Sequence, residues 1–443
     1  MKFITTCFLI IIFVFSIAAQ TSPQILAKAN GQNFTVADLP QELREAFVNL
    51  PKASADVRKL LFNQQIAEIL FEAEAKIRNI SVDKLIETQV NAKVANPTEK
   101  QIQDVYDANR AALGNQTLEQ VRPQIVTFLR REPEQKAMGV FAESLAKKYK
   151  VAVFKDINAQ NLKAADVLAN VNGKSITVRD FEAKNRVALY EQQANVYDQV
   201  KFALTEKIFS ALVSAEAKTQ NVEGNELIAQ EITNKMRDFS NEERDELESD
   251  FRKKLFTKYN AQILLKEPAP LVLQISTDDD PSKGNTNAPV TVVMFSDFQC
   301  SACSAAHPVL QKVLAEYGDK IRFVVRDFPL TTIHQNAFQA ALAANAANAQ
   351  GKFFEYIEYL YRNQAALDKE SLKRYAAEIG LNLAQFELDL QNETNAAEIR
   401  KDMADGANYG ITGTPTIYVN GVKVRRNTAE YFREAINQAL KKQ

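Results

Sequence analysis

Hydrophobic and polar positions divide the chain into a long helical region and a shorter region of alternating strands and helices. Apolar residues recur at three- and four-residue spacing over residues 55–79 and 196–219, which predicts two long helices. The same reasoning predicts shorter helices and strand-like ends between and after them. The helices are expected at 99–112, 118–129, 134–148 and 241–258, and the strand-like ends at 151–154 and 271–275.

The last third of the chain has a different pattern. Residues 290–295 form a short β-branched apolar run typical of a buried strand, and strand and helix patterns then alternate. A strand, a crossover helix and a second strand, followed by a helical insertion, a hairpin and a closing helix, predict an α/β domain. The expected elements are 290–295, 300–317, 321–328, a helical stretch over 334–409, 416–419, 422–424 and 428–441.

An internal repeat spans the helical region. Residues 25–31 (ILAKANG) are echoed by residues 167–173 (VLANVNG), and the agreement continues at the same offset as far as AEAK at 73–76 and 215–218. Such agreement in a single register predicts a duplicated module.

Each copy of the repeat has a readable start. An Asn-Gly dipeptide in each copy favours a hairpin turn. Thr35 and Thr177 are predicted as helix N-caps, with Asp38 and Asp180 three residues later in a capping-box arrangement.

Composition and net charge exclude one class of partner. The 443 residues are 46% hydrophobic and 25% charged, with a net charge of −1 and no concentrated basic stripe. Nucleic acid is therefore not expected as a partner.

The N-terminus resembles a cleaved secretory signal. Lys2 precedes a short apolar run over 8–15, and small residues follow it. The run is short for a membrane span, so we expect residues 1–19 to be a signal peptide and the mature protein to be periplasmic or otherwise exported. An uncleaved anchor is the alternative, and only this segment is expected to meet a membrane.

Removal of the signal also removes Cys7 and leaves Cys300 and Cys303. A bridge between them closes a very small loop, which stabilises a fold little, so chemistry is favoured over a structural disulfide. The pair follows a strand at a predicted helix N-terminus, where backbone N–H groups and the helix dipole stabilise a thiolate. An inert buried pair and a metal site remain as alternatives, although a fourth metal ligand is not evident.

Two distant motifs then resemble one family. SDFQCSAC at 296–303 with Pro308, together with GTPT at 413–416 before a strand–Asn-Gly–strand hairpin, resembles the thioredoxin fold in its DsbA-type, disulfide-forming branch. The resemblance covers residues from about 282 to the end of the chain.

The resemblance implies roles for individual residues. Cys300 corresponds to the exposed attacking thiol and Cys303 to the thiol that resolves the mixed disulfide, so a Cys300–Cys303 disulfide is expected. Pro415 corresponds to a cis-proline beside the pair, and Thr414 to the residue whose backbone meets the substrate chain.

The sequence also departs from this family. Many members carry an acidic residue where Met294 stands, and the strongly oxidising members have Pro-His where Ser301-Ala302 stands. We therefore expect a less oxidising potential than theirs. His307 is expected as a partly exposed helix residue beside the site, and His334 as the residue that opens a helix.

The helical region is similar to the N-terminal chaperone region of SurA-type proteins. The likeness is carried by the NG–IT–D entry of each copy and by PTEKQIQDVYDAN at 97–109. No parvulin-type isomerase domain is recognised, so prolyl isomerase activity is not implied. A dimerisation or spacer domain is the alternative interpretation.

These observations predict a multidomain protein with a mainly α-helical duplicated N-terminal region and a C-terminal α/β thioredoxin-like domain with a helical insertion. The expected layout is a signal peptide (1–19), two SurA-like helical modules (24–155 and 165–276), a linker (277–288) and a DsbA-like domain (289–443).

The expected function is an exported thiol–disulfide oxidoreductase that forms or rearranges disulfides in client proteins held by the N-terminal region. Unfolded or thiol-containing exported proteins would be its partners, together with an unidentified redox partner that resets the cysteine pair. No metal or organic cofactor is implied. Two alternatives remain: an isomerase or reductase that dimerises through the N-terminal region, and a redox-independent holdase chaperone.

Overall fold

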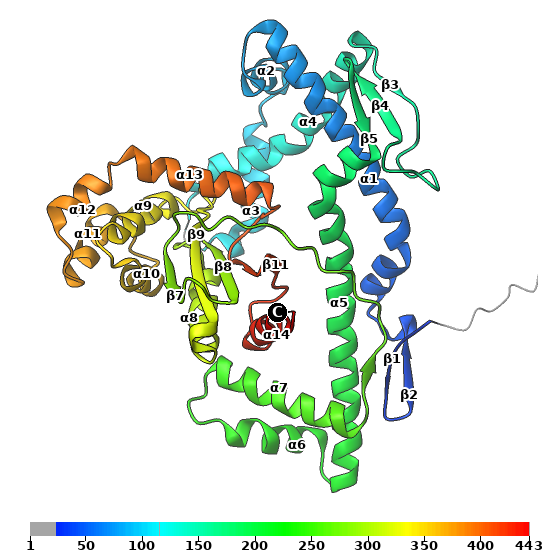
Figure 1. The fold of residues 1–443 in the computed structure, drawn as a ribbon, viewed down its shortest axis with the longest axis vertical. Helices are drawn as coiled ribbons and strands as arrows, with labels where there is room; N and C mark the ends of the chain where they lie inside the picture. The colour runs from blue at the N-terminus through cyan, green and yellow to red at the C-terminus, as the bar shows by residue number, and fades with distance from the viewer. Residues whose placement is uncertain (1–23, 115, 443) are drawn as a thin grey trace, which may run out of the picture. The chain divides into compact units, whose positions relative to one another are not determined.

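The computed structural model describes residues 24–114 and 116–442, so the expected signal peptide lies outside the described residues. The chain divides into two compact units, and Figure 1 labels the helices and strands that they contain. Unit 1 joins the segment up to Phe47 with Tyr197–Glu267, and unit 2 joins Val48–Val196 with Pro268 to the end. None of the described helices combines the length and apolar character needed to cross a membrane.

Unit 1 contains a small sheet of order β2-β1-β6 and a set of helices. The β1–β2 hairpin turns at Asn30-Gly31, where both residues have positive φ, and β1 pairs with β6 from the far end of the helical region. The bounds are β1 Ile25–Ala29, β2 Gln32–Thr35, a 3-10 helix Val36–Asp38, α6 Gly224–Glu231, a 3-10 helix Thr233–Lys235, α7 Asn241–Lys258 and β6 Gln262–Ile263.

The helical part of unit 2 contains the corresponding sheet, of order β3-β4-β5. The β4–β5 hairpin packs against helix α1 through Leu168, Ile176 and Phe62, which are all buried in one core cluster. The bounds are α1 Gln41–Arg78, α2 Val82–Gln89, a 3-10 helix Asn91–Lys93, α3 Glu99–Leu113, α4 Leu118–Lys148, β3 Ala152–Val153, β4 Val167–Val171, β5 Lys174–Thr177 and α5 Val178–Gln220; α1 and α5 each have their N-terminal and C-terminal parts in different units.

The two copies of the repeat make matching contacts. Glu74 is buried and accepts hydrogen bonds from Lys148 Nζ (2.6 Å) and Tyr149 Oη (2.7 Å). Glu216 accepts the same two bonds, at 2.5 and 2.8 Å, from the Lys-Tyr pair at the end of α7. The lysine hydrogen bond is the largest cause that holds the pKa of each carboxyl at about 2.

The compact units do not follow the boundaries of the sequence repeat. The hairpin of the first copy (25–35) lies with the end of the second copy in unit 1, and the hairpin of the second copy (167–177) lies with the first copy in unit 2. The expected modules 24–155 and 165–276 therefore exchange hairpins. Strand pairing between distant segments leaves no local signal, so this exchange could not be read from the sequence.

Three helices of this region are longer than expected. Helix α1 begins at Gln41 and passes through Pro51, and α5 begins directly at Val178. Helix α4 is continuous through Pro123 and Pro133, where two segments were expected. Proline is disfavoured inside a helix because it lacks an N–H, yet α1 and α4 both continue through theirs. Between the two prolines, α4 is stabilised by tertiary contacts such as the hydrogen bond that Arg130 donates to the carbonyl of Val94 (3.1 Å).

The expected capping boxes are confirmed. Thr35 caps the short 3-10 helix that precedes α1, and its backbone N–H donates to Asp38 Oδ2 at 2.7 Å. Thr177 makes the same reciprocal bonds with Asp180 at the start of α5.

The C-terminal part of unit 2 is a five-stranded sheet of order β11-β10-β8-β9-β7 (Figure 1). Strand β8 lies in the centre, parallel to β9 and antiparallel to β10, and its side chains are buried at nearly every position. Burial on both faces explains its continuous apolar sequence. The bounds are β7 Ser282–Gly284, β8 Val290–Ser296, β9 Ile321–Asp327, β10 Thr416–Val419 and β11 Val422–Lys423.

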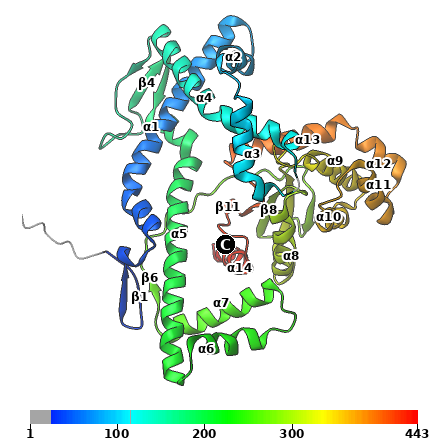
Figure 2. The same ribbon diagram turned by 180° about the vertical axis from the view of Figure 1, so that it is seen from behind.

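The helices of this part confirm the expected order. Figure 2 shows the helical insertion, α9 to α13, gathered on one side of the sheet. Helix α9 is rich in alanine and buried around most of its circumference, which allows close packing of the other insert helices around it. The bounds are α8 Ser301–Ala315, a 3-10 helix Gly318–Lys320, α9 Ala337–Asn348, α10 Phe353–Arg362, α11 Lys369–Glu378, α12 Leu383–Asp389, α13 Glu393–Asn408 and α14 Ala429–Lys441.

The segment expected as a linker is part of this domain. Within 277–288, β7 pairs with β9 at the sheet edge, and Asp280 forms an ion pair with the buried Arg326 at 3.2 Å. The strand-like tail 271–275 also belongs here, because the Leu273 N–H donates to the carbonyl of Gly421 at 2.9 Å and its side chain is buried. The polar, turn-rich composition of residues 277–288 predicted a linker. The segment is instead held to the domain by the pairing of β7 with β9 and by the ion pair of Asp280 with Arg326.

Candidate active site

The cysteine pair lies where the central strand passes into α8. Strand β8 ends at Ser296, a turn follows, and Cys300 is the N-cap residue of α8 without a side-chain capping bond. The carboxylate of Asp297 shapes this turn, since Oδ1 accepts the N–H of Gln299 at 2.7 Å and Oδ2 accepts the N–H of Leu330 at 2.8 Å. The Cys300 sulfur is thereby held at a helix N-terminus, as the sequence predicts.

The two sulfurs, both free thiols in this structure, lie in different surroundings. Cys300 is half-buried, and its pKa is lowered to about 5, first by a hydrogen bond from the Cys303 side chain and further by the backbone N–H groups of Cys303 and Ala302. Cys303 is fully buried, and burial raises the pKa of its thiol above the usual range. At neutral pH the accessible sulfur is a thiolate and the buried sulfur a thiol, which matches the attacking and resolving roles implied by the resemblance.

The structure brings Thr414 and Pro415 to the same place from the far end of the sequence. Their peptide bond is cis, as the resemblance implies, and the Thr414 carbonyl accepts a hydrogen bond from Cys300 Sγ at 3.5 Å. The pairing of β10 with β8, which sets Thr416 opposite Phe295, creates this proximity. All four site residues expected from the sequence thus lie together.

Both histidines differ from expectation. His307 is buried, not partly exposed; its Nε2 lies 2.9 Å from Glu358 Oε1, and burial lowers its pKa. His334 does not open α9, whose N-cap is Asn336; instead its Nδ1 lies 2.7 Å from the Asp297 carboxylate. Sequence spacing could not show either contact, because both partners come from other elements.

Two further residues reach the buried sulfur and were not predicted. The Ser296 hydroxyl lies close enough to lower the pKa of Cys303, and the Ser296 Oγ lies 2.6 Å from the Oη of Tyr361 on α10. Ser296 stands inside the SDFQC motif, so its closeness to the cysteines was available as a signal. Tyr361 lies in the helical insertion, and nothing in its local sequence marks it.

The residues near the site do not form an evident metal centre. In the described part of the chain, one group of three acids, Asp280, Glu398 and Asp402, places carboxylate oxygens within 4.8 Å of one another. The buried Arg326 already pairs with Asp280 and Asp402 there. This cluster fits a buried ion-pair network better than a cation site.

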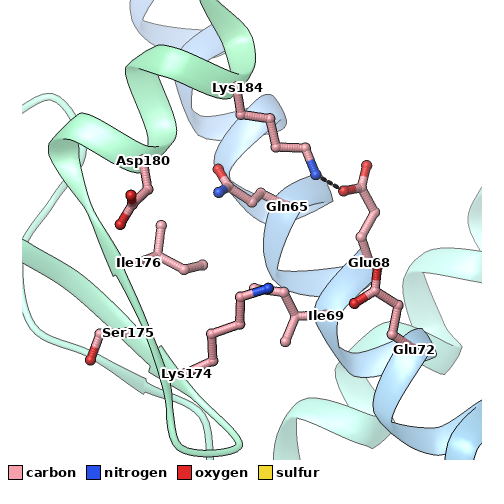
Figure 3. A pocket seen from close by; sticks show the side chains of 9 residues that line it. All are labelled: Gln65, Glu68, Ile69, Glu72, Lys174, Ser175, Ile176, Asp180 and Lys184. Atoms are coloured by element: carbon pink, nitrogen blue, oxygen red, sulfur yellow. Dashed lines mark hydrogen bonds and ion pairs between the residues drawn. The ribbon is translucent and has the colours of Figure 1, made fainter. Parts of the chain in front are cut away.

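A separate hollow of about 400 Å³ lies in the helical part of unit 2 (Figure 3). Helix α1, strand β5 and the start of α5 line it with mostly polar and charged side chains, and Lys184 and Glu68 form an ion pair across it. It contains no cysteine or histidine, so it offers no nucleophile for the chemistry of the cysteine pair.

Comparison with known proteins supports this description of the C-terminal domain. A family model described as Thioredoxin matches residues 276–438. The chain therefore contains a thioredoxin-like domain. The match begins inside the segment that the sequence had suggested as a linker, in agreement with the position of β7.

A curated relative and two solved structures also match. The Na(+)/H(+) antiporter NhaA 3 of Salinispora tropica is 37% identical over 170 residues, which is 38% of this chain and 26% of the antiporter. The chain thus aligns with about a quarter of that relative, and ion exchange is not carried over. A thioredoxin-like oxidoreductase from Silicibacter pomeroyi (29% identity, 37% of this chain and 92% of that one, TM-score 0.34) and oxidised BdbD from Bacillus subtilis (25%, 39% and 100%, TM-score 0.35) are similar structures.

Proposed function

We propose that this protein is an exported thiol–disulfide oxidoreductase in which Cys300 is the nucleophile and Cys303 the resolving cysteine. One observation carries the proposal: a half-buried Cys300 at a helix N-terminus, with a pKa of about 5, beside the Thr414 carbonyl and a buried second thiol. A thiolate at neutral pH is the species that exchanges disulfides, and Thr414 offers backbone groups to an extended client chain.

Oxidation of a client proceeds in two exchanges. A client thiolate attacks Cys300 Sγ, a client–Cys300 disulfide forms, the Cys300–Cys303 bond breaks and its electron pair leaves on Cys303. A second client thiolate then attacks the client sulfur, so the client gains a disulfide and Cys300 leaves as a thiolate. The protein is now reduced by two electrons, and a thiol-oxidising redox partner must restore the Cys300–Cys303 disulfide.

The N-terminal region is proposed to hold client polypeptides near the cysteine pair. Exposed apolar side chains on α4, among them Phe128 (65% exposed) and Val140 (62%), offer contact points for unfolded chains. Clients are proposed to be unfolded or thiol-containing exported proteins, in keeping with the signal-like N-terminus.

The reduction potential of the cysteine pair tests this function. The mature protein is equilibrated with glutathione buffers, and the fraction of Cys300–Cys303 disulfide is read by thiol alkylation and mass spectrometry. We expect a potential between about −120 and −180 mV, less oxidising than the strongest oxidants of this type. A value near about −270 mV would instead favour a reductase, and dimer formation would favour an isomerase.

The Cys300→Ser variant separates the enzyme from a redox-independent holdase. The variant is expected to lose disulfide formation in a reduced client while still suppressing client aggregation to the extent that the N-terminal region does so. If no reversible intramolecular disulfide forms in the wild type, the oxidoreductase proposal is wrong and the holdase remains.

A further inference from the structure

The buried sulfur poses an electrostatic problem for the proposed exchange. The Cys303 sulfur carries negative charge when it leaves the Cys300–Cys303 disulfide, and also when it attacks a mixed disulfide between Cys300 and a client. Cys303 is completely buried, and burial disfavours a thiolate. The strand residue Met294, buried in the same core cluster, contributes only an apolar side chain. Another group must therefore stabilise the charge.

The backbone N–H of Asp297 and the Thr414 side chain meet part of this requirement, since both lower the pKa of Cys303, and two linked hydroxyl groups add to them. Ser296 is the last residue of β8, Tyr361 lies on α10, and both are buried, with Oγ and Oη 2.6 Å apart. The Ser296 hydroxyl also lies close enough to the Cys303 sulfur to lower the pKa of that thiol, after the backbone N–H of Asp297 and together with the Thr414 side chain.

The chemistry of a hydroxyl fixes the direction of these bonds when the sulfur is charged. A hydroxyl has a single proton to donate, and a thiolate can only accept. Ser296 must therefore donate to Cys303, and the Ser296 oxygen must accept the proton that Tyr361 donates. The result is a chain of two donors that ends on the sulfur.

The ionisable groups around this chain make their side-chain hydrogen bonds to other partners, while Asp327 Oδ1 and His307 Nδ1 are buried without one. Asp297 accepts from two backbone N–H groups and contacts His334, and the Oδ2 of Asp327, at the end of β9, accepts a hydrogen bond from Asn345 at 2.6 Å. The His307 ring packs against the Tyr361 ring, with centroids 4.8 Å apart, while its Nε2 meets Glu358. None of these side-chain contacts is made to the Cys303 sulfur; of these residues only Asp297 acts on it, through its backbone N–H.

We propose that Tyr361 and Ser296 form a hydrogen-bond donor chain that stabilises the developing negative charge on Cys303 during disulfide exchange. The inference rests on the proposed function. As the client thiolate bonds to Cys300 Sγ and the Cys300–Cys303 bond breaks, the electron pair leaves on Cys303 Sγ, which accepts the Ser296 hydrogen bond and later takes a proton from water. Tyr361 acts through Ser296 and is a positioning residue.

The test compares Tyr361→Phe and Ser296→Ala with the wild type in the full mature chain. The oxidised proteins react with an excess of a cysteine-containing peptide, the reaction is quenched with acid, and the opening of the Cys300–Cys303 disulfide is followed by mass spectrometry. Because a hydrogen bond to a charged group is worth more than one between neutral groups, we expect a roughly ten- to hundredfold slower opening in Ser296→Ala and a roughly two- to tenfold slower opening in Tyr361→Phe. The double variant is expected to be no slower than Ser296→Ala, since the chain acts as one unit.

A matched control addresses stability. Tyr356 lies on the same helix, is fully buried and donates its hydroxyl to the carbonyl of Leu372 at 2.9 Å. Tyr356→Phe also loses a buried hydroxyl but is expected to open at the wild-type rate. The reduction potential at pH 7 is expected to change little in Tyr361→Phe, because Cys303 is a neutral thiol at equilibrium and the variant alters the transition state.

The outcomes separate this inference from the proposed function. If the wild type shows no reversible disulfide, the proposed function fails first. If the wild type exchanges disulfides and Tyr361→Phe opens as fast as it does, the donor chain is wrong while the function stands. Equal slowing in Tyr361→Phe and Tyr356→Phe would also overturn it, because that result indicates a general loss of packing.

Discussion

At the residue scale, the site depends on the different surroundings of two cysteine side chains at the N-terminus of α8. Cys300 meets N–H groups and a second thiol at the helix N-terminus, whereas Cys303, one turn later, faces the core. The pKa of about 5 for Cys300 lies between the values of roughly 7 for thioredoxin and 3.5 for the strongest oxidants, in keeping with an intermediate potential.

This pKa predicts the pH dependence of alkylation. In the reduced wild type, the rate of Cys300 alkylation by iodoacetamide is expected to rise with an inflexion near pH 5, since only the thiolate reacts. An inflexion near about pH 8.5, as in a free cysteine, would contradict the helix-terminus account.

The same pKa predicts how the stability of the reduced protein depends on pH. Because the Cys300 thiol is more acidic in the folded protein (about 5) than its ordinary value of 9.0, the thiolate contributes stability to the reduced form. That contribution is fully present above about pH 9 and is lost as the pH falls towards about 5. Thermal unfolding of the reduced and oxidised proteins across this window measures it.

At the scale of elements, close packing between the helical insertion and the sheet constrains small residues. Gly406, in α13, faces the side chain that follows β9: a Cβ at this position would lie 2.6 Å from the Cδ2 of Phe328. Gly139, in α4, is also helical but has no atom within 4 Å of such a Cβ. Glycine is therefore required for close packing at position 406 in α13 but not at position 139 in α4.

Alanine at the two positions is expected to have opposite effects. Gly406→Ala should destabilise the protein by about 1–3 kcal/mol, because the Phe328 ring must move in a packed core. Gly139→Ala should stabilise α4 by about 0.5–1 kcal/mol, because it restricts the unfolded chain without a clash. Denaturant unfolding followed by circular dichroism measures both, and destabilisation by both variants would contradict this account.

At the scale of the whole molecule, the exchanged hairpins decide which segments stabilise one another. Leu26 in β1 and Leu168 in β4 are corresponding residues of the repeat, and both are fully buried. Yet the Leu26 carbonyl accepts a hydrogen bond from the N–H of Leu264, next to β6, and the Leu168 carbonyl accepts one from Phe154, next to β3.

Hydrogen exchange is expected to reveal this arrangement. Leu26→Asp buries a charge in unit 1 and should raise amide exchange over 241–264, whereas Leu168→Asp should raise it over 62–75 and 152–154. If Leu26→Asp instead loosened residues 62–75, the two modules would each fold with their own hairpin, and the exchange of hairpins would be wrong.

The sequence by itself determined the local chemistry of this protein. Apolar runs and spacing were sufficient for the main strands and helices of the C-terminal domain other than β7, and the CSAC and GTPT motifs singled out the four candidate site residues, because these features depend on neighbours in the chain. The repeat and its capping boxes could be read for the same reason.

Tertiary structure decided what depends on distant partners. In the tertiary structure, the two modules exchange hairpins, and residues 271–288 pack against the sheet. Helix α4 continues through its prolines, and His307 is buried against Glu358 of the insertion. The tertiary structure also brings Tyr361 to Ser296 across 65 positions. Such contacts form only when the core assembles, so no local pattern of residues records them.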